Sequence, residues 1–300
     1  MDDAVLVAAR ENFAERIQGE CHSMSKAGPI GTCEWWQISE EFLDHLGALS
    51  VVFPDLDAPE VKSVLDNAAE AAVGGVQCAA YFNNTSFFVF LDYANFGMDY
   101  RTDTPCDPDP VSANQWLDAF CLAILSDKAL ENGEAFHFAR EGFDGDVGGQ
   151  PNVELANGLM AYVNGYTDDL DDYPPSREAV AAAIAAALAR VQLGERFSDL
   201  PDHSALRGLY ALAVGDQDAF NAVLTEWLLQ YGTVPDPFTE ITEALVQTGA
   251  VPGPFGKPRA LLPLVPLALT ALAYRREGWQ PPVETDYLPR TLITGCWTGS

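Results

Sequence analysis

The sequence predicts an all-α fold: a multi-helix bundle of antiparallel helical hairpins, with one short β element near residues 85–91. Three observations predict this class. Apolar residues recur every three to four positions along most of the 300-residue chain, capping residues precede several of these segments, and two segments are joined by a very short turn. Hydrophobic residues make up 48% of the sequence, enough for a sizeable core despite a formal net charge of −28. We therefore expect a single helical domain over residues 1–300.

In the N-terminal half, helical spacing marks apolar faces that are each expected to be one helix. They run over Leu6–Ile17, Trp35–Leu49, Val61–Ala68, Trp116–Leu125 and Leu155–Tyr166. Ser112 and Gln115 have the spacing of a capping box, and Pro151 suits the first turn of a helix. The segment Thr85–Leu91 is β-branched and aromatic without helical period. It is expected to be a short buried strand or a buried helix segment.

The C-terminal half has the clearest helical pattern. Ser176 is expected to cap an alanine-rich helix that continues to Val191. A helix that ends at Gly215 and a helix that Asp216 caps are predicted to form an antiparallel hairpin with a very short turn. A last helix is predicted over about residues 263–277, with Gly278 after it.

Acidic residues are concentrated in the first part of the chain. Residues 1–175 carry 31 acidic and 7 basic side chains, whereas residues 176–300 carry 13 and 9. We therefore distinguish an acidic N-terminal half with loops, 1–175, from a near-neutral helical scaffold half, 176–300. The negative charge argues against direct nucleic-acid binding and against polybasic attachment to a membrane, because phosphates and anionic lipids both require a basic surface.

A cytoplasmic location is expected. Asp2 and Asp3 are acidic where a signal peptide would be basic, and the most apolar run, Ala260–Tyr274, is too short to span a bilayer. None of the six cysteines forms a C-x-x-C pair, so free thiols are expected. Cys121 lies on an apolar helical face and is expected to belong to the core.

The common catalytic and metal-binding motifs are missing from the sequence. It contains no phosphate loop, no G-x-S-x-G elbow and no H-E-x-x-H motif. The four histidines are far apart, and each is expected to be a surface or capping residue. Residues 144–149 resemble only the start of a calcium loop, since its last ligand position is Leu155. No catalytic residue, cofactor or metal site is therefore predicted.

The best enzymatic candidate is the acidic run Asp168–Asp172. Its D-D-x-x-D spacing resembles the aspartate-rich motif of all-α terpene synthases, which implies Mg²⁺ and a diphosphate substrate. The second metal motif of that family is missing, and Pro174 and Pro175 follow the run directly. A Mg²⁺-dependent lyase is kept as an alternative, and it requires the aspartates to face an apolar cavity inside a helical bundle.

Three parts of the chain resemble the immunity protein 49 family. Leu212–Leu224 is similar to its central helical hairpin, and Gln115–Ala123 is similar to its middle helix. Leu261–Leu269 and Glu284–Pro289 resemble its C-terminal end. The resemblance covers about residues 110–290 in spaced patches. It implies an all-α fold and a role beside bacterial polymorphic toxins, whose activity the immunity protein blocks.

A toxin-binding protein without enzymatic activity is the function that these observations favour. The expected partner is a cognate protein toxin, such as a nuclease or another enzyme with a basic cleft, which an acidic surface attracts at long range. The predicted contact surface combines aspartates with tyrosines that could serve as exposed anchors. Its residues are Asp103, Asp107, Asp109, Asp144, Asp146, Asp168, Asp169, Asp171, Asp172, Tyr100 and Tyr173. A helical adaptor without a toxin partner is a further alternative, which a neighbouring toxin gene would disfavour. The oligomeric state is left open.

Overall fold

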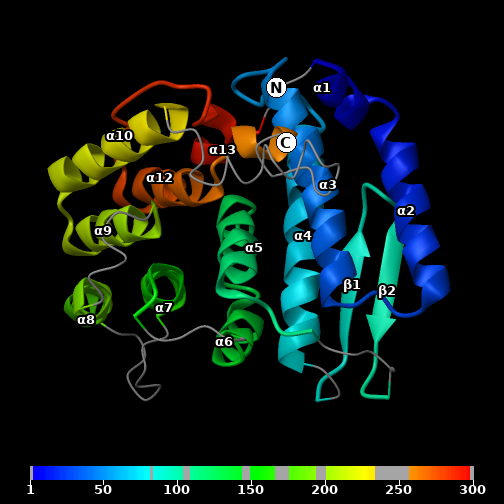
Figure 1. Cartoon of the computed structure of the whole chain (residues 1–300), viewed down its shortest axis with the longest axis horizontal. Helices are drawn as coiled ribbons and strands as arrows, with labels where there is room; N and C mark the ends of the chain where they lie inside the picture. Colours follow the sequence, from blue (N-terminus) through cyan, green and yellow to red (C-terminus); the bar gives the residue numbers. More distant parts are fainter. Residues whose placement is uncertain are drawn as a thin grey trace, which may run out of the picture.

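The described part of the chain is a bundle of α-helices with one small antiparallel sheet (Figure 1). A computed structural model describes residues 3–81, 84–103, 109–143, 149–165, 176–193, 201–233 and 257–297. The predicted all-α class and the predicted β element near residues 85–91 are both confirmed. Among the helices described, none is both long and apolar enough to cross a membrane.

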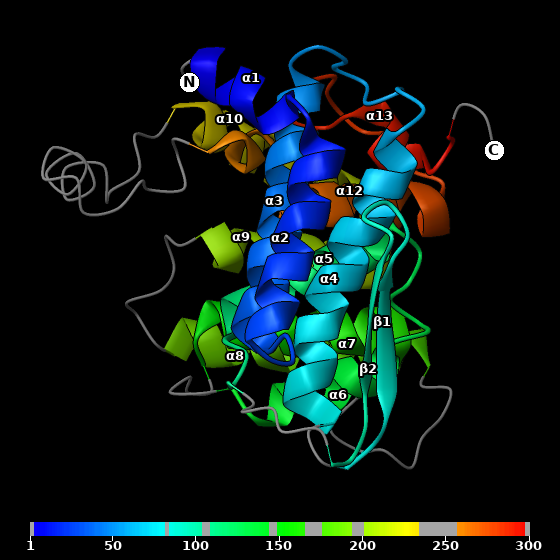
Figure 2. The same cartoon turned by 90° about the vertical axis from the view of Figure 1, so that its right-hand side faces the viewer.

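The N-terminal helices and the sheet form one side of the bundle (Figure 1). The helices are α1 (Asp3–Arg10), α2 (Phe13–Ala27), α3 (Thr32–Ser50) and α4 (Val61–Tyr81), and the strands are β1 (Phe87–Leu91) and β2 (Phe96–Tyr100). The hairpin of β1 and β2 runs along α4, as Figure 2 shows from the side. Strand β2 was not predicted, although Phe96, Met98 and Tyr100 alternate with Gly97 and Asp99 in the period-two pattern of a strand.

The remaining helices continue from α4 to the opposite side of the bundle (Figure 1). They are α5 (Ala113–Leu125), α6 (Gly133–Glu141), α7 (Pro151–Asn164), α8 (Arg177–Leu193), α9 (Pro201–Val214), α10 (Gln217–Thr233), the 3₁₀ helix η2 (Pro258–Leu261), α12 (Leu264–Glu277) and α13 (Arg290–Thr294). The predicted α9–α10 hairpin is confirmed, and its second helix runs one residue past Gly232.

The first predicted helix is in fact two helices. Helix α1 ends at Arg10 and α2 begins at Phe13, because Asn12 adopts a left-handed φ of 50°. Asparagine adopts this conformation more readily than most residues do. Leu6 and Ile17 are nevertheless both buried, as their spacing predicts. Periodicity therefore identified the buried face correctly and missed the break between the two helices.

The predicted capping residues are confirmed. The Gln115 backbone N–H donates to Ser112 Oγ at 3.3 Å, and the Ser112 N–H donates to Gln115 Oε1 at 3.1 Å. The side chains of Ser176 and Asp216 accept hydrogen bonds from backbone N–H groups three residues later, at 3.2 Å and 3.0 Å. Helix α7 begins at Pro151. These local contacts satisfy donors that a helix N-terminus otherwise leaves unpaired.

Helices α3 and α4 form the centre of the hydrophobic core. Trp35 and Phe42 on α3 are fully buried. The C-terminal part of the chain returns to this pair at η2, where a Cβ on Gly47 would lie 2.0 Å from the Pro258 carbonyl oxygen. Only glycine permits so close an approach of two backbones. The core therefore joins segments that lie more than two hundred positions apart in the sequence.

Arginine side chains close several helix C-termini. Arg275 joins α5 to α13, since it donates to the carbonyl oxygens of Leu125 at 3.2 Å and of Ile293 at 3.0 Å. Arg276 and Arg177 donate in the same way to carbonyls in the last turns of α7 and α9, at 2.9 Å and 2.8 Å. A cation is favourable at this end of a helix, because the helix dipole is negative there and the last carbonyls lack partners.

Candidate partner-binding surface

The β-hairpin and the residues after it position the described part of the predicted acidic surface. The strands are antiparallel, with Phe87 opposite Tyr100 and Leu91 opposite Phe96. Because side chains alternate between the faces of a strand, these two pairs share one face. That inner face packs on α4, where the lack of a side chain at Gly74 makes room for the buried Val89.

Tyr100 is a predicted surface residue that is in fact buried. Its side chain is 3% exposed and stacks on Phe87, with ring centroids 4.5 Å apart. Its hydroxyl accepts a hydrogen bond from Trp35 Nε1 at 2.7 Å and donates to the Ile30 carbonyl. The prediction of an exposed anchor at Tyr100 is therefore wrong. The strand phase turns this side chain inward, where it fastens the end of β2 to α3.

Two of the predicted aspartates are described, and both are exposed. Asp103 and Asp109 follow β2, and Asp109 Oδ2 accepts a hydrogen bond from Cys33 Sγ at 3.2 Å. The contact brings Asp109 to the N-terminus of α3. It also raises the pKa of the Cys33 thiol, because the carboxylate bonds to the protonated form. Cys33 thus stays a thiol and is a poor nucleophile at neutral pH.

The other predicted site residues lie outside the described residues. They are Asp107, Asp144, Asp146, Asp168, Asp169, Asp171, Asp172 and Tyr173. The D-D-x-x-D run of the lyase alternative is among them. Within the part of the chain that is described, no three His, Cys, Asp or Glu residues are grouped so that they could hold a metal ion.

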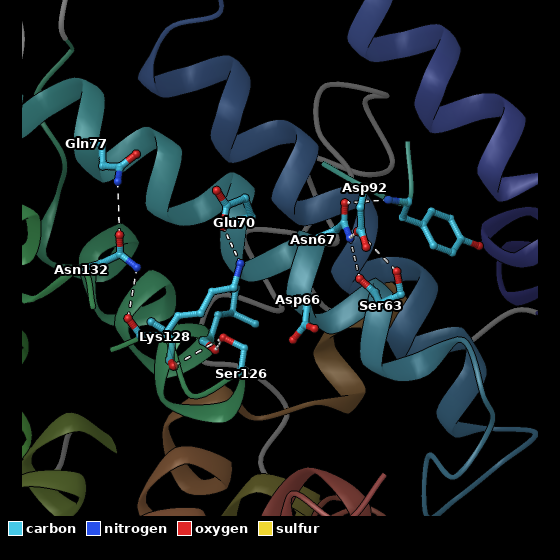
Figure 3. Close-up of polar contacts among 12 residues, drawn as sticks. Ser63, Asp66, Asn67, Glu70, Gln77, Asp92, Ser126, Lys128 and Asn132 are labelled. Atoms are coloured by element: carbon cyan, nitrogen blue, oxygen red, sulfur yellow. Dashed lines mark hydrogen bonds and ion pairs between the residues drawn. The ribbon is translucent and has the colours of Figure 1, made fainter. Parts of the chain in front are cut away.

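A row of polar side chains on α4 holds the hairpin turn in place (Figure 3). Asn67 is buried, and its Nδ2 donates to the Ser63 carbonyl at 2.7 Å and to Asp92 Oδ1. Its Oδ1 accepts from the Tyr93 backbone N–H at 3.2 Å. The Tyr93 hydroxyl donates a hydrogen bond to Glu60 at 3.3 Å. Burial, and to a smaller extent the negative charge of Glu60, raises the pKa of Tyr93 to about 12. The turn is therefore fixed to α4 by several bonds at once.

The same helix face binds the connection between α5 and α6 (Figure 3). Lys128 forms an ion pair with Glu70, and Gln77 Nε2 donates to Asn132 Oδ1 at 3.2 Å. Asn132 in turn donates to the Lys128 carbonyl at 3.1 Å. These groups bind one another and leave no poised acid–base pair among them. We call the side chains of Asn67, Glu70 and Gln77 the α4 polar row. We assign this row a structural role, which is to hold two surface segments rigid.

Acidic side chains lie at both ends of the hairpin. Glu60 and Asp92 are exposed beside its turn, while Asp99 and Asp103 are exposed at the end where β2 finishes. The sequence pattern did not mark Glu60, Asp92 and Asp99 as surface candidates, because none of them lies in a cluster of acidic residues. A period-two interpretation of Phe87–Leu91 would have divided its residues between the two faces of the strand, without showing which face is exposed.

A second surface lies on the α9–α10 hairpin. A groove of about 280 Å³ is lined by both basic and acidic side chains, among them Arg207, Asp216 and Glu226, with Tyr210 and Val223. Charges of both signs meet in this groove, so it does not share the acidic character of the β-hairpin ends.

The comparisons with known proteins give one match. The sequence model of the family Immunity protein 49 matches residues 54–292, which is most of the chain and extends further toward the N-terminus than the three resembling parts of the sequence. No curated protein and no solved structure matches the chain. The matched range includes the β-hairpin, the α4 polar row and the α9–α10 hairpin. Because the match covers well over half of the 300 residues, the chain belongs to the immunity protein 49 family.

Proposed function

We propose that this protein is an immunity protein that binds and neutralises a cognate bacterial toxin in the cytoplasm, by placing an acidic surface against a basic cleft of the toxin. Membership of the immunity protein 49 family is the observation that carries the proposal. Such a protein needs no catalytic group of its own. It needs a rigid framework and a surface complementary to one partner.

The way in which basic side chains are used supports an acidic contact surface. Arg275, Arg276 and Arg177 donate hydrogen bonds to helix carbonyls, so their side chains are held against the framework. Arg259 and Arg190 bind the buried carboxylates of Asp44 and Glu154. With 16 basic residues against 44 acidic ones, this leaves a large negative surplus for the surface. A surplus of this kind steers a basic partner and accelerates association.

The proposed contact surface includes the described Asp103 and Asp109 and the acidic segments outside the described residues, above all Asp168–Asp172. It could occupy a nuclease-type cleft in place of a phosphate backbone, because carboxylates satisfy the same lysine and arginine side chains. Proteins with another kind of basic active site would be blocked in the same way.

A toxin encoded by a neighbouring gene would provide the direct test. Cells that express it should grow only when the wild-type chain is co-expressed. The D103N/D109N variant and the D168N/D169N/D171N/D172N variant should each bind a catalytically inactive form of that toxin more slowly at low salt, roughly three- to tenfold, with a weaker salt dependence. Stability should change little, because neutralising surface charges usually costs less than about 0.5 kcal/mol.

A matched control for D103N/D109N keeps its charge change of two and moves it elsewhere. The E226Q/E284Q variant neutralises two exposed acids on α10 and in the segment before α13. It should leave the association rate and its salt dependence close to wild type. Equal effects in this control and in D103N/D109N would mean that only the net charge of the chain matters, and not the position of the acids. Growth that fails even with the wild-type chain would contradict the proposed function itself.

A further inference from the structure

The outer face of the β-hairpin carries two exposed, stacked phenylalanines. Phe88 and Phe90 are 57% and 47% exposed, with ring centroids 6.1 Å apart and planes 13° from parallel. Phe90 is opposite Gly97 on β2, and a Cβ there would lie 2.8 Å from Phe88 Cζ and 3.1 Å from Phe90 Cδ2. The two rings therefore lie flat across the space that the glycine leaves free. The result is a small aromatic platform, Phe88 and Phe90, facing solvent.

A platform of this kind is costly unless something binds it. Aromatic surface that stays in water does not gain the free energy of burial. Both strands of a two-stranded sheet are edge strands, which can pair with other chains. An apolar face that is left in solvent adds a second risk of aggregation. Val89 and Leu91, the neighbours that alternate with the platform, are fully buried, so the hairpin does not need these rings for its own core. Such exposed patches mark interaction sites in many proteins.

Acidic groups lie opposite Phe88 on the neighbouring strand and beyond the ends of both strands. Asp99 is directly opposite Phe88 in the strand register and pairs with Arg101 at 2.9 Å. Asp92 follows β1 directly, and Asp103 lies three residues beyond β2. An apolar centre with a charged rim is the usual anatomy of a protein–protein interface. The rim here is negative, so the complementary partner surface is basic.

The platform is also held rigid before any partner binds. Asn67 fixes the hairpin turn to α4, and the Tyr100 hydroxyl ties the other end of the hairpin to Ile30 and Trp35. Both ends of the hairpin are thus fastened to the framework, and Figure 3 shows the contact between Asn67 and Asp92 at the turn end. A surface that is already ordered loses little conformational entropy on binding, which favours high affinity.

We infer that Phe88 and Phe90 form the apolar centre of the toxin-binding surface, and that the toxin presents arginine or lysine side chains that stack on the two rings and pair with Asp92, Asp99 and Asp103. This inference rests on the proposed function and specifies where the toxin docks. Guanidinium and ammonium groups are attracted to the faces of aromatic rings, and an adjacent carboxylate strengthens the contact. The rings and the acids therefore select the same kind of partner.

The F88T/F90T variant tests the inference. Threonine keeps a high strand propensity, so the hairpin should persist and the thermal unfolding midpoint should stay close to wild type. The dissociation constant for the catalytically inactive toxin should rise at least about 30-fold, the size typical of an interface hot spot. Its salt dependence should remain, because the acids are unchanged. The F88Y/F90Y variant keeps both ring faces and should bind within a few-fold of wild type.

The matched control is F138A, which removes a 44% exposed phenylalanine from α6 on another part of the surface. It should leave toxin binding unchanged. Hydrogen exchange offers a second readout that needs no variant: amides of residues 87–100 should be protected in the complex relative to the free chain.

The outcomes separate the two proposals. If the wild-type chain binds the toxin and F88T/F90T binds equally well, with no added protection of residues 87–100, the inference fails and the proposed function stands. If the wild-type chain does not bind the toxin, both fail. A wild-type dimer that becomes a monomer in F88T/F90T, at unchanged toxin affinity, would assign the platform to a second copy of this chain and would also overturn the inference.

Discussion

The β-hairpin side and the C-terminal helical side of this protein use charged residues in opposite ways. On the C-terminal helical side, basic side chains are tied to the framework: Arg275 and Arg276 bind backbone carbonyls, and Arg190 binds Glu154, which is only 1% exposed. Around the hairpin, Asp92 and Asp99 face solvent beside two exposed aromatic rings. The difference shows that charge supports the framework on one side, while on the other it is available for a partner.

The largest effect is expected from a change at the ion pair of Arg190 with the buried Glu154. Glu154 accepts from Arg190 at 2.8 Å and 2.6 Å and from the Gly149 backbone N–H at 2.8 Å. Replacing Arg190 by methionine should lower the free energy of unfolding by about 3 kcal/mol, because it leaves a buried carboxylate without its counter-charge. Denaturant unfolding measures this. E154Q should cost less, since Arg190 is 43% exposed and can reach solvent. Equal losses in the two variants would contradict this account.

A medium effect is expected where the hairpin meets α4. The N67A variant removes the acceptor for the Tyr93 N–H and the donor to Asp92, so about 1–3 kcal/mol of stability should be lost. Toxin affinity should fall as well, because the turn is no longer fixed. Compared with N67A, the R190M variant should lower the stability of the chain more and its affinity for the toxin less. If the two variants affect affinity equally at matched stability, the hairpin has no special role.

The smallest expected effect is a pH dependence in the N-terminal helices. His45 is buried, stacks on Phe13 with ring centroids 4.1 Å apart, and its Nδ1 is 3.0 Å from the Ala9 carbonyl oxygen. Burial lowers the pKa of His45, so the neutral form is favoured in the folded chain. The imidazole therefore contributes full stability above the unfolded pKa of about 6.5. That contribution is lost as the pH falls below this value, by at most about 1.4 kcal/mol per pH unit.

Urea unfolding at several pH values between 7.5 and 5 tests this dependence. The H45Q variant should lose less stability across that interval than the wild-type chain does. The exposed His22 provides the control, and H22Q should follow the wild-type curve. Parallel curves for wild type and H45Q would show that other groups cause the acid sensitivity.

The four histidines were expected to be surface or capping residues. His45 is not on the surface: it is buried, and it bonds to a carbonyl oxygen near the end of α1.

Much of the fold follows from local sequence. The capping residues Ser112, Ser176 and Asp216 act within three residues of the helices they begin, so spacing alone identified them. Cys121, predicted to belong to the core, is fully buried. Less of the candidate surface could be predicted. Asp103 and Asp109 are exposed as expected, but Tyr100 is buried and Phe88 is exposed.

The sequence by itself determined most of the helices, three of their caps, the β element near residue 87 and the surplus of acid, because each depends on composition or on neighbours a few positions apart. Only the tertiary structure decided which face of the hairpin is covered. Alternation shows that Phe88 and Phe90 share a face, and that Val89 and Leu91 share the other, but both faces are apolar. Helix α4 covers the second face, so the first remains in solvent and becomes the surface that a partner can reach.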